Sequence, residues 1–212
     1  MNKRQAGEII NILAQTYPNA EAELNFTTNY ELLVAVILSA QCTDKRVNIV
    51  TAELFKEYNT PEKMLTLTQE ELEEKIKTCG LYRSKAKHIL SASYDIVTKF
   101  NGQIPETVES LQTLAGVGRK TANVVYAVGF GGDAIAVDTH VFRVSNRLGL
   151  ANAKMPLETE KSLNRLIDRH LWGKAHHYII HHGRNLCSAK NPKCGVCPLN
   201  GHCKYFNSVA KN

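Results

Sequence analysis

The stretch LQTLAGVGRKTANVVYAVGFGGDAIAVDTH, residues 111–140, decides the fold of this chain. It predicts a short helix that ends near Leu114, a tight turn at Gly116 and Gly118, and a second helix over residues 121–130, where apolar residues recur at helical spacing. The two glycines permit positive φ angles and a close approach of the backbone to another molecule. The same pattern is also typical of two helices that simply pack against each other.

The start of the second predicted helix has the features of an anion-binding site. Its first amide groups have no intrahelical acceptor, so together with the helix dipole they can hold a phosphate. Arg119 and Lys120 add positive charge at this point. The dipole, the adjacent arginine and burial against the apolar helix would each disfavour the charged form of the lysine. Lys120 is therefore a candidate nucleophile for Schiff-base formation, with a solvated lysine beside a phosphate as the alternative.

The composition is that of a globular protein. The chain has 212 residues, of which 43% are hydrophobic and 22% charged, and this suits one large domain or two small ones with a real core. No apolar run is long enough to cross a membrane, and the first ten residues lack the apolar stretch of a signal peptide. We therefore expect a cytoplasmic protein with no membrane partner.

The net charge of +6 is unevenly distributed along the chain. Residues 1–110 hold 12 Lys and Arg against 15 Asp and Glu, whereas residues 111–212 hold 14 against 5. Such an asymmetry predicts an anionic partner for the second half, and nucleic acid is the commonest one.

Helical periodicity dominates, and no sustained alternation indicates a strand, so we predict an all-α fold. A segment from Tyr30 to Ala40 is apolar on nearly every face, which predicts a buried central helix. Thr60 and Thr68 are typical helix N-caps. The other expected helices span residues 4–17, 47–58, 84–100, 139–148, 157–170 and 174–185.

Four of the six cysteines lie within 17 residues, with the spacing C-x6-C-x2-C-x5-C. In a chain without a secretion signal, clustered cysteines bind metal more often than they form disulfides. Four thiolates can hold a tetrahedral zinc ion or a [4Fe–4S] cluster, and the spacing alone favours neither. The candidate ligands are Cys187, Cys194, Cys197 and Cys203. Cys42 and Cys79 lie far away in predicted helices, where we expect them to be small buried apolar residues.

A run of histidines offers a second candidate metal site. His176, His177, His181 and His182 lie four and five residues apart on one predicted helix, a separation that lets two imidazoles share a metal. The glutamate of the zinc hydrolase signature is missing beside the first pair. Polar or core histidines are therefore the favoured interpretation.

Three motifs together resemble the endonuclease III family of helix–hairpin–helix DNA glycosylases. They are LAGVGRKTANVV, then IAVDTHVFRVSNR, and then the cysteine spacing described above. The resemblance extends through LLVAVILSAQCTD and GLYRSKA, so it covers nearly the whole chain.

The resemblance implies a two-domain helical fold with double-stranded DNA bound across the cleft. Residues 22–132 would form a central domain that contains the helix–hairpin–helix, and residues 1–21 with 133–212 would form a discontinuous second domain. The second domain would carry a [4Fe–4S] cluster on the four clustered cysteines. The implied activity is that of a bifunctional glycosylase and AP lyase, which acts on damaged pyrimidines and abasic sites. We expect the protein to be a monomer that is associated with the nucleoid.

The resemblance also assigns residues by position. Lys120 would be the nucleophile that attacks the sugar C1′, and Asp138, 18 positions later, the assisting carboxylate. Asp138 can equally serve as an N-cap for the next helix. The remaining implied residues are Gln41 filling the gap left by a flipped base, Leu81 as a wedge, and Asp44 and His140 as pocket contacts. We also expect DNA contacts from Gly116, Gly118, Arg119, His140, Arg143 and Lys190.

Two other interpretations compete with this one. A mismatch adenine glycosylase has the same cysteine spacing, but it would lack Lys120, carry a glutamate on the early apolar helix and extend into a further C-terminal domain. Here no carboxylate occurs between Glu31 and Asp44, and the sequence ends nine residues after Cys203. A non-catalytic DNA-binding module would use the hairpin only as a clamp, and the presence of both Lys120 and Asp138 disfavours it.

Overall fold

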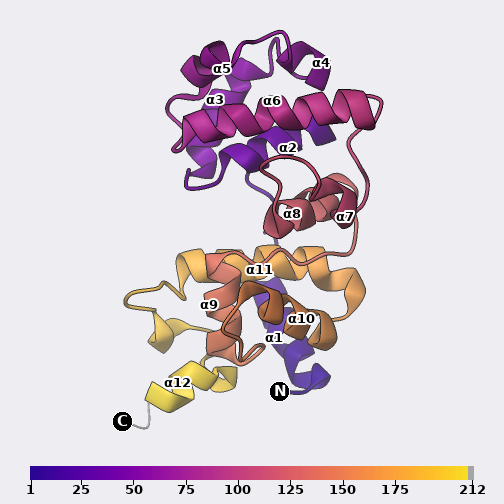
Figure 1. The fold of residues 1–212 in the computed structure, drawn as a ribbon. Helices are drawn as coiled ribbons and strands as arrows, with labels where there is room; N and C mark the ends of the chain where they lie inside the picture. The colour runs from indigo at the N-terminus through magenta and orange to yellow at the C-terminus, as the bar shows by residue number, and fades with distance from the viewer. Residues whose placement is uncertain (210–212) are drawn as a thin grey trace. The chain divides into compact units, whose positions relative to one another are not determined.

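The structure is a computed structural model that describes residues 1–209. These residues form helices joined by turns and contain no strand, which confirms the all-α prediction (Figure 1). The chain divides into two compact units. Unit 1 consists of Met1–Ala22 and Asp133–Asn212, and unit 2 of Glu23–Gly132.

Unit 2 is built around one helix that is buried on every face. Every residue from Tyr30 to Leu38 in this helix is buried, and the helix packs against three neighbours in the unit, α3, α6 and α8. Thr28 caps its N-terminus by accepting a hydrogen bond from the Glu31 amide. The helices of unit 2 are α2 (Asn29–Leu38), α3 (Asp44–Leu54), α4 (Pro61–Met64), α5 (Gln69–Ile76), α6 (Tyr82–Lys99), α7 (Val108–Leu111) and α8 (Arg119–Gly129).

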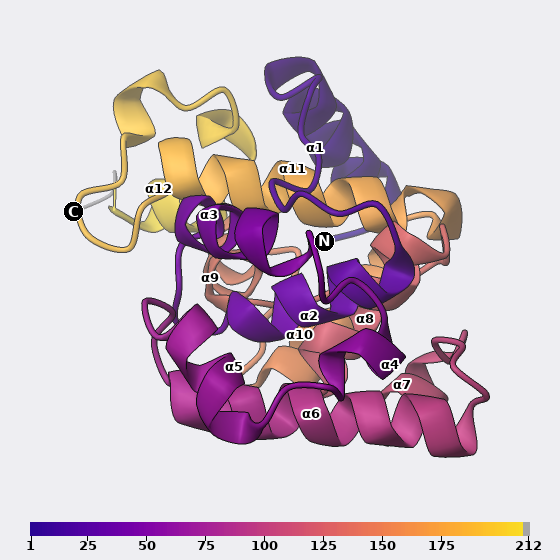
Figure 2. The same cartoon turned by 90° about the horizontal axis from the view of Figure 1, so that it is seen from above.

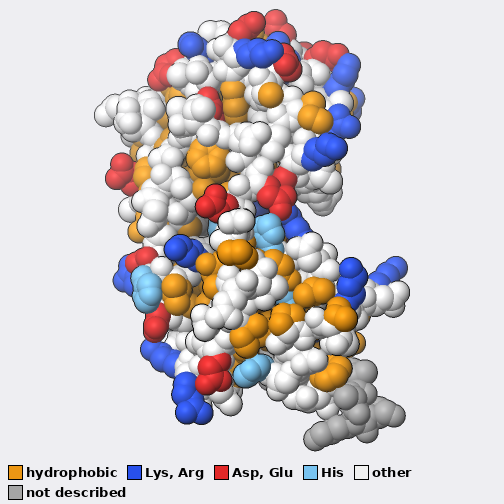
Figure 3. All heavy atoms as spheres, turned by 180° about the vertical axis from the view of Figure 1, so that it is seen from behind, with side chains coloured by type: hydrophobic (Ala, Val, Ile, Leu, Met, Phe, Trp, Pro, Cys, Tyr) orange, Lys and Arg blue, Asp and Glu red, His pale blue; other side chains and the backbone are white. Residues whose placement is uncertain are grey.

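The longest helix of unit 2, α6, packs against α4 and α5, as Figure 2 shows. Both short helices begin where the sequence predicts, at the N-caps Thr60 and Thr68. Thr68 forms a capping box with Glu71, which satisfies two amide donors at once. Acidic and basic side chains both lie on the surface at this end of the unit (Figure 3).

The predicted hairpin joins α7 to α8 and depends on Gly116. Its φ angle is +76°, and an added Cβ atom would lie 2.7 Å from the Cβ atom of His88. Both the backbone angle and the neighbouring side chain therefore require glycine. Gly118 instead has a φ angle of −81° and no heavy atom within 4 Å of an added Cβ, so it leaves the start of α8 open.

Unit 1 has α9 and α11 at its centre. Gly183 lets the two helices approach closely, because an added Cβ atom would lie 3.0 Å from the His140 Cβ and 3.1 Å from the Val144 Cγ2. Helices α1, α10 and α12 pack around this pair. The helices are α1 (Lys3–Thr16), α9 (Thr139–Leu148), α10 (Pro156–Leu166), α11 (Trp172–Asn185) and α12 (Lys204–Val209), with short 3₁₀ turns η1 (Arg169–Leu171), η2 (Cys194–Val196) and η3 (Asn200–His202).

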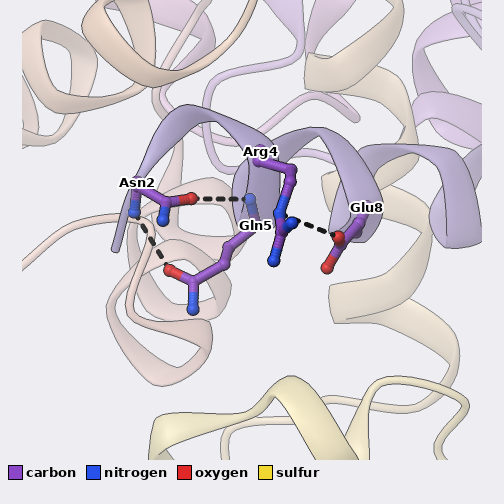
Figure 4. A network of polar contacts seen from close by, with 4 residues as sticks. All are labelled: Asn2, Arg4, Gln5 and Glu8. Carbon is purple, nitrogen blue, oxygen red and sulfur yellow. Dashed lines mark hydrogen bonds and ion pairs between the residues drawn. The ribbon is translucent and has the colours of Figure 1, made fainter.

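Helix α1 begins with a capping box (Figure 4). The Gln5 amide donates to Asn2 Oδ1 at 2.9 Å, and the Asn2 amide donates to Gln5 Oε1 at 3.1 Å. Arg4 pairs with Glu8 one turn on, with a distance of 3.6 Å between Nε and Oε1. These contacts fix the start of the helix, whose apolar face is buried in the core of unit 1.

Three predictions about helices were wrong. The helix expected over residues 47–58 instead spans Asp44–Leu54. The helix expected over residues 157–170 ends at Leu166, because Ile167 takes an extended backbone conformation that buries its side chain. Its carbonyl then accepts a hydrogen bond from Trp172 Nε1 at 3.0 Å. Cys42 and Cys79 lie in turns rather than in helices. Cys79 is nevertheless fully buried, whereas Cys42 is partly buried.

No helix within residues 1–209 combines the length and the apolar character needed to cross a lipid bilayer.

The contrast between the hairpin glycines gives a first prediction. We expect Gly116→Ala to lower the free energy of unfolding by about 1 to 3 kcal/mol, because the new Cβ atom meets His88 and the residue must keep a positive φ. Gly118→Ser should leave stability unchanged, because serine is a good N-cap and the space is open. Urea unfolding of both variants measures the difference, and equal stability would contradict the backbone argument.

Candidate functional site

Lys120 lies in the first turn of α8 in unit 2, two residues after the open N-cap Gly118. Its side chain is exposed, so the burial against the apolar helix expected from the sequence was wrong. The buried face of the helix is formed instead by Ala122, Asn123 and Val125.

Asp138 is the N-cap of α9 in unit 1, as the sequence suggested. Its Oδ1 atom accepts a hydrogen bond from the Val141 amide at 2.7 Å. The side chain is half-buried and follows the buried segment from Ala134 to Val137. The carboxylate is thus fixed at the positive end of a helix, where negative charge is favoured.

The structure brings Gln41 and Leu81 to the same part of unit 2. Gly80 lies so close to Gln41 that an added Cβ atom would be 3.1 Å from the Gln41 carbonyl oxygen. Gln41 and Leu81 both have left-handed backbone conformations, with φ angles of 53° and 59° respectively. Such angles are unfavourable for residues other than glycine. Leu81 is also 58% exposed. A strained backbone that holds a large apolar side chain in solvent points to a functional role.

A buried lysine supports these two loops. Lys85 is 3% exposed, and its Nζ atom donates a hydrogen bond to the Leu38 carbonyl oxygen at 2.7 Å. Leu38 ends α2 just before the loop with Gln41, and Lys85 lies in the helix that Leu81 precedes. Burial lowers the pKa of the Lys85 ammonium. Lys85 therefore ties the base of one loop to the other.

Three further predicted contacts occupy different surroundings. Asp44 is half-buried in the first turn of α3, two residues past Cys42. His140 and Arg143 lie one turn apart on α9, with 3.1 Å between His140 Nδ1 and Arg143 Nη2. Arg143 also donates to the carbonyl oxygens of Gly183 and Cys187, each at 3.0 Å. The guanidinium group thus holds the end of α11 in place, and its contact with DNA stays a prediction.

The four clustered cysteines line one pocket in unit 1. All four are free thiols, and the pocket encloses about 340 Å³ of empty space, part of it open to solvent. Its other walls are largely apolar and include Leu148, Leu186, Pro192 and Phe206. Within residues 1–209, no three His, Cys, Asp or Glu side chains converge closely enough to hold a single metal ion.

The thiols suit an iron–sulfur cluster. Burial raises the pKa of the Cys197 and Cys203 thiols. They therefore become thiolates only when bound iron stabilises the negative charge, and cluster binding must release protons. Four sulfur ligands spread around an apolar pocket are the donor set of a [4Fe–4S] cluster.

Arg147 holds the cysteine loop through its backbone. It donates to the carbonyl oxygens of Ser188 and Ala189 at 2.7 and 3.0 Å, and its Nη1 atom lies 3.5 Å from the Cys187 Sγ. The guanidinium group also lies over the Tyr205 ring, 4.8 Å from the ring centroid. Arg147 thus positions one ligand and the loop that follows it.

On the other side of the pocket, His182 and Tyr17 form a polar contact with another ligand. His182 Nε2 is 3.6 Å from Cys197 Sγ, and His182 Nδ1 is 3.2 Å from the Tyr17 hydroxyl. Burial lowers the pKa of His182 to about 4, so the ring is neutral. Burial and the nearby Cys197 raise the pKa of Tyr17 to about 12. His176, from the same histidine run, instead bonds the Ala136 carbonyl oxygen at 2.7 Å and is a core residue.

The loop between the first two cysteines forms a compact turn. Ser188 Oγ donates to the carbonyl oxygens of Lys190 and Asn191, and Asn191 has a φ angle of 48°. Lys190 and Lys193 are both exposed on this turn. The loop therefore presents two cations from a backbone held by Arg147.

The sequence reasoning missed Tyr17, Lys85 and Arg147. It identified His182 as a polar or core histidine, which its burial confirms, but did not place it beside a cysteine. Three of these four residues were detectable in principle. Lys85 occupies a core-facing position four residues before Ile89, and His182 continues the buried series of Ala175 and Ile179. Arg147 follows Arg143 by one helical turn. Polar residues at buried helical positions were the signal.

The family models match two parts of the chain. Residues 34–169 match the HhH-GPD superfamily of base excision DNA repair proteins, and residues 187–203 match the iron–sulfur binding domain of endonuclease III. The second match begins and ends at Cys187 and Cys203. The fold and the cysteine pocket together thus define a base excision DNA repair protein of the helix–hairpin–helix class.

Similar proteins span the whole chain. Endonuclease III of Haemophilus influenzae is 45% identical over 209 residues, which cover 99% of both chains. Endonuclease III of Bacillus subtilis is 47% identical over 205 residues, or 96% of this chain and 94% of the relative. A solved structure of a trapped endonuclease III–DNA covalent intermediate has a TM-score of 0.94 and 44% identity, with 99% of both chains covered. A non-covalent endonuclease III–DNA complex gives 0.95 and 43%, with full coverage of both.

The chain belongs to the endonuclease III family. It is a DNA glycosylase and AP lyase of base excision repair with a [4Fe–4S] cofactor. The mismatch adenine glycosylase and the non-catalytic module are therefore the less favoured interpretations. A thermostable thymine-DNA glycosylase shares the fold at a TM-score of 0.85, with only 20% identity.

The pocket geometry gives a prediction about the cofactor. The purified protein should be yellow-brown and contain about four iron atoms per chain. Cys203→Ala should lose most of the iron and lower the melting temperature, because Cys203 lines the pocket. Cys79→Ala is the matched control, since it removes an equally buried thiol from unit 2 and should retain the iron. A colourless protein with one zinc ion per chain would reject the cluster.

Proposed function

We propose that this enzyme removes oxidised pyrimidines from double-stranded DNA and cleaves the strand at the resulting abasic site, with Lys120 as nucleophile and Asp138 as assisting carboxylate. The observation that carries the proposal is the exposed amine at the open end of the hairpin, in a chain 44% identical to an endonuclease III trapped covalently on DNA. A covalent intermediate requires a nucleophile on the protein, and a lysine amine supplies one.

The reaction follows from the residue types. A damaged base leaves the duplex stack, and the Lys120 amine attacks C1′ of its sugar as the bond to the base breaks. The product is an imine between the lysine and the opened sugar. Loss of a proton from C2′ then expels the 3′ phosphate and nicks the strand. Water releases the lysine by hydrolysis of the imine.

Asp138 has two possible chemical tasks in this scheme. Its carboxylate can accept a proton from the lysine ammonium, or it can stabilise the positive charge that develops on the sugar as the base departs. The hydrogen bond from the Val141 amide fixes the carboxylate for either task. The cap and the chemistry use different lone pairs, so one residue can serve both.

We propose that Gln41 and Leu81 keep the DNA open once the base has left. Leu81 is an exposed apolar side chain on a strained backbone, suited to insertion between bases. Gln41 lies in the adjoining loop and can offer an amide to the base that has lost its partner. Asp44, in the first turn after that loop, and His140 are the proposed pocket contacts.

The hairpin and the cysteine loop are the proposed phosphate contacts. The hairpin backbone at Gly116 and at the open position Gly118, with Arg119, offers amides and charge to one phosphate. Arg143 and Lys190 extend the contacts in unit 1. Binding should therefore weaken as salt concentration rises. We expect the enzyme to act as a monomer in the cytoplasm, where it would be associated with the nucleoid.

Borohydride trapping tests the nucleophile. Wild-type enzyme mixed with a duplex that contains thymine glycol should give a covalent adduct when borohydride reduces the imine. Lys120→Ala should give none, whereas Lys99→Ala, which removes an exposed lysine at the far end of α6, should behave as wild type. A panel with 5-hydroxycytosine, 8-oxoguanine and an abasic site defines the lesion class. Tight binding of the wild type without any adduct would favour a non-catalytic clamp.

Asp138→Asn separates the cap from the chemistry. Asparagine caps helices as well as aspartate does, so stability should be retained, whereas Asp138→Ala should cost about 1 kcal/mol. Base excision by Asp138→Asn should fall by about 10²-fold or more because the carboxylate is lost. Cleavage of a pre-formed abasic site should fall less if the carboxylate serves base departure, and equally if it deprotonates the lysine. Full excision activity in Asp138→Asn would exclude both tasks.

A further inference from the structure

Unit 1 contains a chain of three side chains that ends on a cysteine of the metal pocket. The Tyr17 hydroxyl is 3.2 Å from His182 Nδ1, and His182 Nε2 is 3.6 Å from Cys197 Sγ. Tyr17 ends α1, His182 lies in the last turn of α11, and Cys197 follows η2. Three segments distant in sequence therefore meet at one ligand.

The roles of donor and acceptor follow from the chemistry of a bound thiolate. A cysteine sulfur that binds iron carries no proton, so Cys197 can only accept a hydrogen bond. His182 Nε2 must then carry the proton. In a neutral imidazole the other nitrogen, Nδ1, is consequently an acceptor, and the Tyr17 hydroxyl must donate to it. Each contact in the chain has a single consistent direction.

The surroundings hold the imidazole in this orientation. His182 is 1% exposed, so water offers little competition for either nitrogen. The Tyr17 ring packs edge-on against it, with centroids 6.0 Å apart and an interplanar angle of 72°. The raised pKa of Tyr17 keeps the phenol protonated at neutral pH, so it remains a donor. The histidine is thus fixed by packing on one side and by a hydrogen bond on the other.

We propose that Tyr17 and His182 form a hydrogen-bond relay that fixes the histidine tautomer and tunes the reduction potential of the iron–sulfur cluster through Cys197. A hydrogen bond to a ligand sulfur withdraws electron density and stabilises the more reduced cluster, so the relay raises the potential. His182 acts here as a positioning residue, because it contacts a ligand and not the DNA substrate. The inference rests on the cluster assignment and is independent of the lesion chemistry.

Voltammetry of the purified, cluster-loaded protein tests the relay. In His182→Leu the donor to Cys197 is lost, and the potential should become more negative by about 59 mV, equivalent to a tenfold change in the ratio of reduced to oxidised cluster. Tyr17→Phe keeps the ring but not the hydroxyl, so it should shift the potential in the same direction and less. His182→Gln, which retains an N–H donor, should recover part of the shift.

Tyr205→Phe is the matched control, because Tyr205 also lines the pocket and its hydroxyl takes no part in the relay. Resonance Raman spectra supply a second readout. The Fe–S(Cys) bands should respond to exchange into D2O in the wild type and respond less in His182→Leu. Coloured variants with unchanged potentials and unchanged deuterium response would overturn the relay, even if their melting temperatures fell. A colourless wild type would instead reject the cluster.

Discussion

Helix α2 buries side chains on every face, so the polar groups at its two ends must find partners in neighbouring elements. At the N-terminus, the buried Glu31 accepts hydrogen bonds from the Thr27 amide and hydroxyl at 2.6 and 2.8 Å. At the C-terminus, the Leu38 carbonyl accepts the Lys85 ammonium. The second bond couples the core to the loop of Gln41, the proposed contact in the opened DNA, because the chain turns directly from Leu38 into that loop. The buried end of α2 needs a hydrogen-bond partner, and the bond that satisfies it also holds the loops of the strained surface residues Gln41 and Leu81.

Helix α9 has the corresponding position in unit 1. Its N-terminus carries Asp138, whose carboxylate caps the helix. Further along, the partly buried Arg143 and Arg147 hold the end of α11 and the cysteine loop. Asp138, the proposed assisting carboxylate, and the two arginines that bond the cysteine loop therefore lie on one helix. Loss of the cluster would free the loop that both arginines bond. A change at the cysteine pocket can in this way influence a residue at the other end of the same helix.

Local signals in the sequence were sufficient for most of the fold. The bounds of α9 match the prediction, since Asp138 is a strong N-cap and Gly149 takes a left-handed conformation at the end. The end of α10 was missed because burial of Ile167 overrides local helix propensity. The exposure of the Lys120 side chain was missed for a related reason. Helical periodicity shows which face of α8 is apolar, but it does not show whether a side chain in the first turn packs against that face or points into solvent. Lys85 escaped notice because a core position is normally apolar.

Arg143 and Arg147 bind the end of α11 and the cysteine loop through main-chain oxygens. The acceptors are the carbonyl oxygens of Gly183, Cys187, Ser188 and Ala189. Any amino acid presents the same carbonyl group. Substitutions among the outward-facing residues of this loop should therefore leave its anchorage intact. Evolution could vary the chemistry of that surface from one relative to another while the hydrogen bonds from the two arginines stay the same.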